Sequence, residues 1–188
     1  MVAPTPLLVA GVDGTIRHGP DQTGHPVTGP DDVHVFQHAR LQVGRWHTTY
    51  GGRVLLVTNQ PGISGGTIDP DKALEAMDVT AHDLGGDHVD AWAVCPHRPQ
   101  DGCWCRKPRP GNVLSLISHL QSAHPDETYP PHLTVVVGGA ADAGCAAALG
   151  VPFVDAGQWR EHGYRPPVTR TPGDDVIREF AASIDSDD

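Results

Sequence analysis

The sequence contains no long apolar run and no excess of basic residues. No stretch of about 18 apolar residues occurs in its 188 residues, so we expect no membrane span. Acidic residues outnumber basic ones by 23 to 13, and the formal net charge is -10. No Lys/Arg cluster is present to neutralise phosphates. Nucleic acid and anionic membranes are therefore disfavoured as main partners.

Cysteine is also scarce, and its distribution is uneven. The first residues lack a basic segment followed by an apolar stretch and a small-residue cleavage site, so we expect a cytoplasmic protein. Three of the 4 cysteines lie within residues 95–105, together with a histidine. In a protein without a secretion signal, this clustering favours metal binding over disulfides.

The length suits one α/β domain with a sizeable core. Short apolar runs predict buried strands over residues 7–10, 54–57, 89–94, 133–137 and 151–154. Helical spacing predicts helices over residues 33–48 (capped by Asp31 or Asp32), 71–84, 113–124 and 142–149. This alternation predicts a doubly wound, mostly parallel sheet.

The remaining segments are assigned by composition. The Gly- and Pro-rich stretch 18–30 predicts a loop. We assign residues 1–162 to the α/β domain and residues 163–188 to a Pro- and Asp-rich extension, in which a short helix near 175–184 fits the pattern. Ligands of such sheets bind beyond the carboxyl ends of the strands. Polar segments follow four predicted strands directly, so we expect them to converge on one crevice.

Those segments carry a recognisable set of motifs in a fixed order. They are residues 11–15 (GVDGT), 57–62 (VTNQPG), 95–108 (CPHRPQDGCWCRKP) and 138–142 (GGAAD). Read together, they resemble the signature of haloacid dehalogenase-like (HAD) phosphatases, in the branch that contains heptose-bisphosphate and histidinol-phosphate phosphatases. The resemblance implies a Rossmann-like fold without an inserted cap domain, a zinc-binding loop over 95–105 and phosphate-ester hydrolysis.

Two of the aspartates that the resemblance implies are absent. The family's first motif is Asp-x-Asp-Gly-Thr, in which the first Asp attacks phosphorus and the second acts as acid and base. The first position is Gly11, and the second survives as Asp13. The Mg²⁺-binding aspartate of the fourth motif falls on Gly138, or on Gly139 with a one-residue shift, and Asp142 remains. Because Mg²⁺ needs oxygen ligands, we expect Mg²⁺ binding and hydrolysis to be lost or severely impaired.

The phosphate-binding half of the motif set is retained. The resemblance implies that the Thr58 hydroxyl, the neighbouring groups of Asn59 and Gln60, and the Lys107 ammonium contact phosphate, with Arg106 near a second anionic or sugar group. With two carboxylates gone, Lys107 is expected to face less competition for an anion. We therefore expect binding of a phosphorylated, sugar-like small molecule without Mg²⁺.

The spacing of the cysteine cluster predicts a metal centre. Cys95-x-His97 and Cys103-x-Cys105 supply three thiolates and one imidazole, the composition of a closed tetrahedral zinc site. Four protein ligands leave no open coordination position, so the zinc is expected to be structural.

Several functions remain open from the sequence. The first is a pseudo-phosphatase that senses a phosphorylated metabolite or regulates a partner enzyme. The second is an enzyme with different acid-base chemistry through Asp13. The third is an active heptose-bisphosphate or histidinol-phosphate phosphatase with a displaced carboxylate, for which Asp142 is the candidate. The fourth is a purely structural partner-binding protein.

Overall fold

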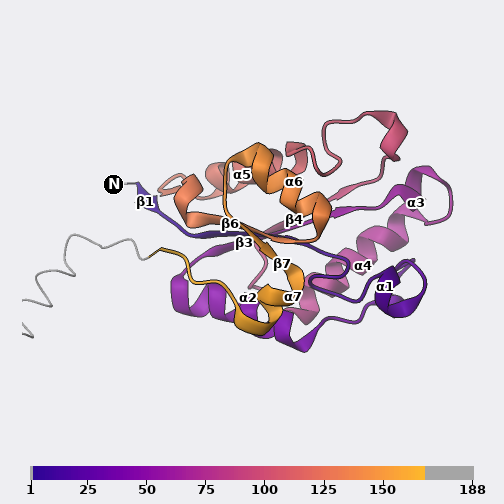
Figure 1. The fold of residues 1–188 in the computed structure, drawn as a ribbon, viewed down its shortest axis with the longest axis horizontal. Helices are drawn as coiled ribbons and strands as arrows, with labels where there is room; N and C mark the ends of the chain where they lie inside the picture. The colour runs from indigo at the N-terminus through magenta and orange to yellow at the C-terminus, as the bar shows by residue number, and fades with distance from the viewer. Residues whose placement is uncertain (1, 168–188) are drawn as a thin grey trace, which may run out of the picture.

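Five parallel strands form the central sheet of the computed structural model, which describes residues 2–167 (Figure 1). Their spatial order is β4-β3-β2-β6-β7, and every neighbouring pair is parallel. The strands are β2 (Leu7–Gly11), β3 (Arg53–Asn59), β4 (Ala91–Cys95), β6 (Thr134–Gly138) and β7 (Phe153–Asp155). The prediction of an α/β fold with a parallel sheet is confirmed.

Helices cover both faces of this sheet. They are α1 (Pro20–Thr23), α2 (Gln37–Tyr50), α3 (Pro61–Ser64), α4 (Pro70–Asp83), α5 (Gly111–Ala123), α6 (Ala140–Leu149) and α7 (Ala156–His162). Single 3-10 turns form η1 (Pro30–Asp32), η2 (Pro99–Asp101) and η3 (Pro131–Leu133). Helices α2, α4 and α7 lie on one side of the sheet, and α5 and α6 lie on the other (Figure 1). None of the helices described here is long and apolar enough to cross a membrane.

The alternation of side chains along β2 divides the core into two layers. Leu8 and Ala10 pack in the cluster beneath α2, α4 and α7, whereas Leu7 and Val9 pack in the cluster beneath α5 and α6. All four are 0% exposed, which is why the strand is a continuous apolar run with no polar alternation. This burial fixes the register of β2, and with it the position at which the polar residues after Gly11 leave the sheet.

Several predicted boundaries differ from the observed ones. Helix α2 begins at Gln37 and not at residue 33, because Val35 pairs with Arg17 in an antiparallel bridge and holds the chain extended. The stretch 18–30 contains the one-turn helix α1, and helix α7 was not predicted. A two-stranded sheet of β1 (Ala3–Pro4) and β5 (Glu127–Thr128) was also missed. The predicted helix near 175–184 lies outside the described residues.

Far from the polar segments, an ion-pair cluster ties β3 to its neighbours. The Arg53 guanidinium lies 2.6 Å from Oε1 of Glu127 and 2.9 Å from Oδ1 of Asp90. Tyr129 donates a hydrogen bond to Glu127 at 2.9 Å. The hydrogen bond from Arg53 lowers the pKa of Glu127 below its ordinary value of 4.5. Since the folded-state pKa is depressed, the stabilisation is present above pH 4.5 and is lost as pH falls through the folded value.

We expect Glu127→Gln to flatten the acid limb of the stability curve. The unaltered protein should lose stability relative to the variant as pH falls below about 4.5, and urea unfolding across this range measures the difference. Glu75→Gln is the matched control, because Glu75 forms an exposed ion pair with Lys72. Parallel pH curves for the unaltered protein and Glu127→Gln would contradict the expectation.

Candidate functional site

The polar segments identified in the sequence meet at the carboxyl edge of the sheet. Gly11, the last residue of β2, pairs with Val57 of β3, and Asn59 at the end of β3 pairs with Cys95 at the end of β4. Strand β6, which ends at Gly138, lies on the other side of β2. Four loops therefore leave the same edge of the sheet, where ligands of open α/β sheets bind.

Asp13 accepts hydrogen bonds on both carboxylate oxygens. Nε of Arg17 lies 2.8 Å from Oδ1, and the Arg17 side chain is 2% exposed. Thr58 Oγ1 and Gln60 Nε2 donate to Oδ2 at 3.0 and 2.6 Å. Arg17 also donates to the carbonyl of Ala76 and to Thr80, which anchors it on α4. Asp13 is thus held by three donors from different parts of the chain.

Lys107 and Asp142 form a second, more deeply buried pair. Lys107 Nζ lies 2.6 Å from Oδ1 of Asp142, and both side chains are 8% exposed. The same ammonium donates to the carbonyl of Val57 at 2.9 Å, and the N–H of Gly139 donates to Oδ2 of Asp142 at 3.0 Å. The sequence-based expectation that Lys107 faces less competition for an anion is not met, because the Asp142 carboxylate contacts it directly.

Glycine at positions 11 and 138 makes room for that carboxylate. An ideal Cβ on Gly11 would lie 2.5 Å from Oδ2 and 2.9 Å from Cγ of Asp142. A Cβ on Gly138 would overlap the same carboxylate. Contacts this short do not occur between real side chains, so any larger residue at either position would require Asp142 to move.

The other predicted phosphate ligands also have internal partners. The Asn59 amide exchanges two hydrogen bonds with the backbone of Lys107, both at 3.1 Å. The backbone N–H of Gln60 donates to the carbonyl of Cys95 at 2.8 Å. Arg106 donates to the carbonyl of His97 through Nη1 at 2.9 Å. These contacts join the loop after β3 to the 95–108 loop and give the edge of the crevice a fixed shape.

Two cavities open beside these groups. One, of about 400 Å³, is bounded by Asp13, Asn59 and Gln60 together with the apolar side chains of Val27 and Ile68. The other, of about 270 Å³, is bounded by three basic residues and the neighbouring loop, including Arg106, Lys107 and Arg109. The first has the size of a small metabolite, and the second collects positive charge in a protein whose formal net charge is -10.

The four predicted zinc ligands lie together. Ligand atoms of Cys95, His97, Cys103 and Cys105 all lie within 4.8 Å of one another. The Cys103 and Cys105 sulfurs are 3.4 Å apart, and Nδ1 of His97 is 3.2 Å from the Cys105 sulfur. Donors around a tetrahedral zinc at about 2.3 Å stand roughly 3.8 Å apart, so this set fits the ion.

No disulfide links these three sulfurs, since Cys95, Cys103 and Cys105 are all free cysteines. Burial raises the pKa of the Cys95 thiol to about 12. A buried sulfur of this kind needs a cation beside it to lose its proton at neutral pH. The site is therefore compatible with a structural zinc that also ties the end of β4 to the 95–108 loop.

Comparison with known proteins adds independent information. No family model matches the chain. The D-glycero-alpha-D-manno-heptose-1,7-bisphosphate 7-phosphatase of Mycobacterium tuberculosis is 39% identical over 90 residues, which are 45% of this chain and 43% of that protein. The D-glycero-beta-D-manno-heptose-1,7-bisphosphate 7-phosphatase of Pseudomonas putida is 33% identical over 124 residues, which are 61% of this chain and 65% of that protein.

A solved structure with a similar fold is also that of a heptose-bisphosphate phosphatase. The D,D-heptose 1,7-bisphosphate phosphatase of Bordetella bronchiseptica, crystallised with magnesium and phosphate, superposes with a TM-score of 0.64 at 24% identity. The superposition covers 95% of this chain and 99% of that one. The chain is a homologue of heptose-bisphosphate phosphatases and has the HAD-like fold. The matched region nevertheless spans less than half of the mycobacterial relative.

The HAD-like fold gives the two ion pairs a context. The resemblance found in the sequence implies a nucleophile at position 11 and a magnesium ligand at position 138 or 139, and all three positions are glycine here. The surviving carboxylates, Asp13 and Asp142, are each paired with a cation of the same chain. Arg17 and Lys107 of the same chain therefore neutralise the two carboxylates of the crevice.

Two residues of the crevice were missed from the sequence. Arg17 lies four residues after Asp13, and this spacing is the sequence feature that could have indicated the ion pair. Arg160 of α7 donates to the carbonyl of Gly14 at 2.6 Å, and its guanidinium lies 4.2 Å from the centre of the Phe36 ring. No local pattern connects Arg160 with Gly14, because 146 residues separate them. Arg160 thus fixes the turn that follows Asp13.

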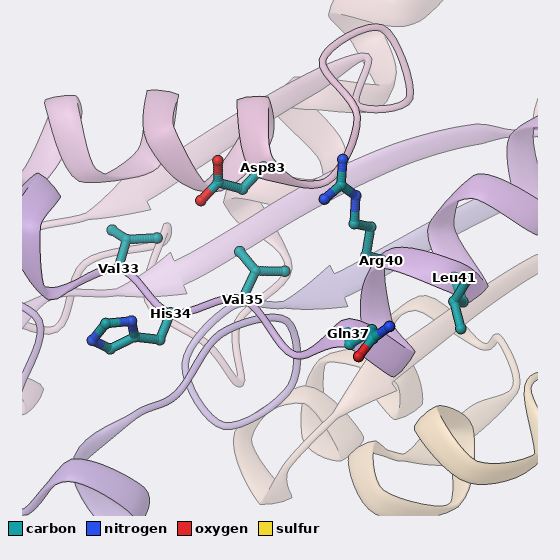
Figure 2. Close-up of a pocket in the computed structure, with 7 residues that line it drawn as sticks. All are labelled: Val33, His34, Val35, Gln37, Arg40, Leu41 and Asp83. Carbon is teal, nitrogen blue, oxygen red and sulfur yellow. The ribbon is translucent and has the colours of Figure 1, made fainter.

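A third cavity lies apart from this HAD-like crevice. It has a volume of about 630 Å³ and lies between the start of α2 and the end of α4 (Figure 2). Val33 and Val35 line it from the segment before α2, Arg40 from α2 and Asp83 from α4 (Figure 2). It shares no lining residue with the cavities beside Asp13 and Lys107. This cavity therefore lies outside the candidate site.

Proposed function

We propose that this chain binds a phosphorylated, sugar-sized small molecule in the crevice and does not hydrolyse it through an aspartyl phosphate. The names of its homologues support the ligand class, since they are phosphatases of heptose bisphosphates. The 400 Å³ cavity beside Asp13 offers space for a sugar, and Arg106 in the separate basic cavity offers a phosphate contact. A structural zinc at residues 95–105 would support the loop that carries Arg106.

The proposed loss of hydrolysis is supported by the state of the carboxylates. Covalent phosphoryl transfer needs a carboxylate oxygen free to attack phosphorus. Position 11 has no side chain, both oxygens of Asp13 accept hydrogen bonds, and both oxygens of Asp142 do the same. Mg²⁺ would have to bind without the carboxylates that the motif places at positions 11 and 138, although it usually takes one or two in protein sites.

The test is hydrolysis of a phosphomonoester panel that includes heptose 1,7-bisphosphate and histidinol phosphate, with and without Mg²⁺. We expect no Mg²⁺-dependent turnover, but measurable binding of sugar phosphates by calorimetry in Mg²⁺-free buffer. Magnesium is omitted and not chelated, because a chelator would also remove zinc. The P. putida relative serves as the positive control. Mg²⁺-dependent hydrolysis approaching that of the relative would contradict the proposal.

One observation favours a second candidate, a phosphatase with a displaced nucleophile. The Asp142 carboxylate lies within 2.9 Å of the point where a side chain at position 11 would begin. If the panel reveals turnover, Asp142→Asn should abolish it while Asp78→Asn, an exposed change on α4, leaves it intact. The low exposure of Asp142 and its absence from the lining of both crevice cavities favour the non-hydrolysing role.

Acid-base chemistry through Asp13 is the third candidate carried from the sequence. Arg17, Thr58 and Gln60 already occupy the Asp13 oxygens, so a substrate proton would have to displace one of these donors. The crevice therefore favours binding over proton transfer.

A further inference from the structure

The anionic partner of Lys107 comes from helix α6 and not from strand β2. In the HAD-like motif, the carboxylate at position 11 is the group whose charge this lysine neutralises, and that position is Gly11 here. Asp142, at the first turn of α6, contacts the ammonium instead. We propose that Asp142 has taken over as the built-in counter-ion of Lys107 and thereby closes this lysine to phosphate from solvent. The inference stands whether or not the ligand proposed above binds.

Both glycines are required for this arrangement. A Cβ at Gly11 would lie 2.5 Å from Oδ2 of Asp142, and a Cβ at Gly138 would overlap the same carboxylate. The backbone φ of Gly138 is 157°, which side chains of L-residues rarely adopt. Positions 11, 138 and 142 therefore form one coupled set. Positions 11 and 138 lack a side chain, and the Asp142 carboxylate occupies the space that side chains there would need.

The charge of Lys107 explains why a substitute carboxylate is needed. A lysine that is 9% exposed keeps its charge only with an anion or several acceptors beside it. Apart from Asp142, its ammonium donates to the carbonyl of Val57. Asp142 is itself held in place by the N–H of Gly139. The pair thus satisfies the lysine with groups of the same chain and needs no external ion.

The side chain of Lys107 also contributes to the wall of a cavity, although its ammonium bonds Val57 and Asp142, which do not line that cavity. Lys107 shares the lining of the 270 Å³ cavity with Arg106 and Arg109. The Asp142 carboxylate offsets the charge of one of these three side chains, Lys107. Neutralising Asp142 would leave three cationic side chains around one small space, which is the arrangement that attracts anions. Asp142 therefore controls whether Lys107 behaves as half of an ion pair or as an anion ligand.

The test is calorimetric titration of inorganic phosphate into the Mg²⁺-free, zinc-loaded protein. Asp142→Asn should raise phosphate affinity by about tenfold or more, because one negative charge is removed from contact with Lys107. Adding Lys107→Gln to Asp142→Asn should remove that gain. Asp78→Asn removes the same charge from an exposed position on α4 and should leave affinity unchanged. A folded Asp142→Asn variant with unchanged phosphate affinity would overturn the inference.

A second variant decides the case if Asp142→Asn does not fold. Combining Gly11→Asp with Asp142→Ala removes the atoms that a Cβ at position 11 would meet and moves the carboxylate back to position 11, where it can again pair with Lys107. We expect this variant to fold and to show the low phosphate affinity of the unaltered protein. Gly11→Asp alone should melt at a lower temperature than the transposed variant, since it places two carboxylates in one space. A transposed variant as unstable as Asp142→Asn would show that the carboxylates are not interchangeable and would refute the proposal.

Discussion

Removal of the proposed zinc ion, or replacement of Cys95 by serine, is expected to unfold the chain at moderate temperature. Zinc binding to a small structural site contributes on the order of 10 kcal/mol. That matches the whole stability of an ordinary domain, which is about 5–15 kcal/mol. Cys95 is the last residue of β4 and is 0% exposed, so loss of its metal bond also disturbs the strand next to β3. Metal analysis should give one zinc per chain, and thermal unfolding followed by circular dichroism measures the loss.

Cys145→Ala is the matched control for this prediction. Cys145 is equally buried but lies on α6 among the apolar side chains beneath α5 and α6. It should retain zinc and lose only about 1–2 kcal/mol, the cost of a small cavity. A Cys95→Ser protein that melts at the same temperature as the unaltered protein, with no zinc detected in either, would mean that the cysteine cluster holds no structural metal.

The fold was predictable because the three central strands of the sheet, β2, β3 and β6, are buried on both faces. Strand β2 is five residues long and fully buried, so it reads as an apolar run with a turn after it. Elements whose bounds depend on contacts with distant parts of the chain were harder to predict from the sequence. Helix α7 has only 7 residues, and α2 begins late because the segment before it pairs with the loop after Asp13. The residues Asp31 and Asp32, predicted to cap α2, instead form part of the 3-10 turn η1.

The sequence predicted which residues belong to the candidate site, but not which of them contact one another. Motif order located Asp13, Lys107 and the cysteine cluster, because the segments that carry them begin where strands β2 and β4 end. The partner of Lys107 could not be inferred in this way, since 35 residues separate it from Asp142 and the contact depends on the missing side chain at Gly11. The absence of two carboxylates predicted less competition for the Lys107 ammonium, whereas the space beside Gly11 admits the Asp142 carboxylate.

The second large effect is expected at Arg17, a buried cation that the motif itself does not explain. Arg17 is 1% exposed, and it joins Asp13 in the crevice to Ala76 and Thr80 of α4. Replacement by methionine leaves the Asp13 carboxylate without its cation and Thr80 Oγ1 without the donor that Arg17 supplies, whereas the Ala76 carbonyl keeps its hydrogen bond from Thr80. Breaking one side of a buried pair costs roughly 3 kcal/mol or more, which urea unfolding measures. Arg45→Met, an exposed change on α2, should have little effect.

A double-mutant cycle separates the ion pair from the packing of the arginine stem. Asp13→Asn alone leaves Arg17 buried without its carboxylate, and Arg17→Met alone leaves Asp13 without its cation. If the two residues stabilise each other, the double variant should be more stable than the sum of the two losses predicts, by about 1–2 kcal/mol. Additive losses would mean that Arg17 stabilises the fold through α4 alone. A positive coupling would mean that Asp13 is primarily the anchor of a buried arginine, so that the surviving motif aspartate of this HAD-like chain has a structural role in addition to any contact with ligand.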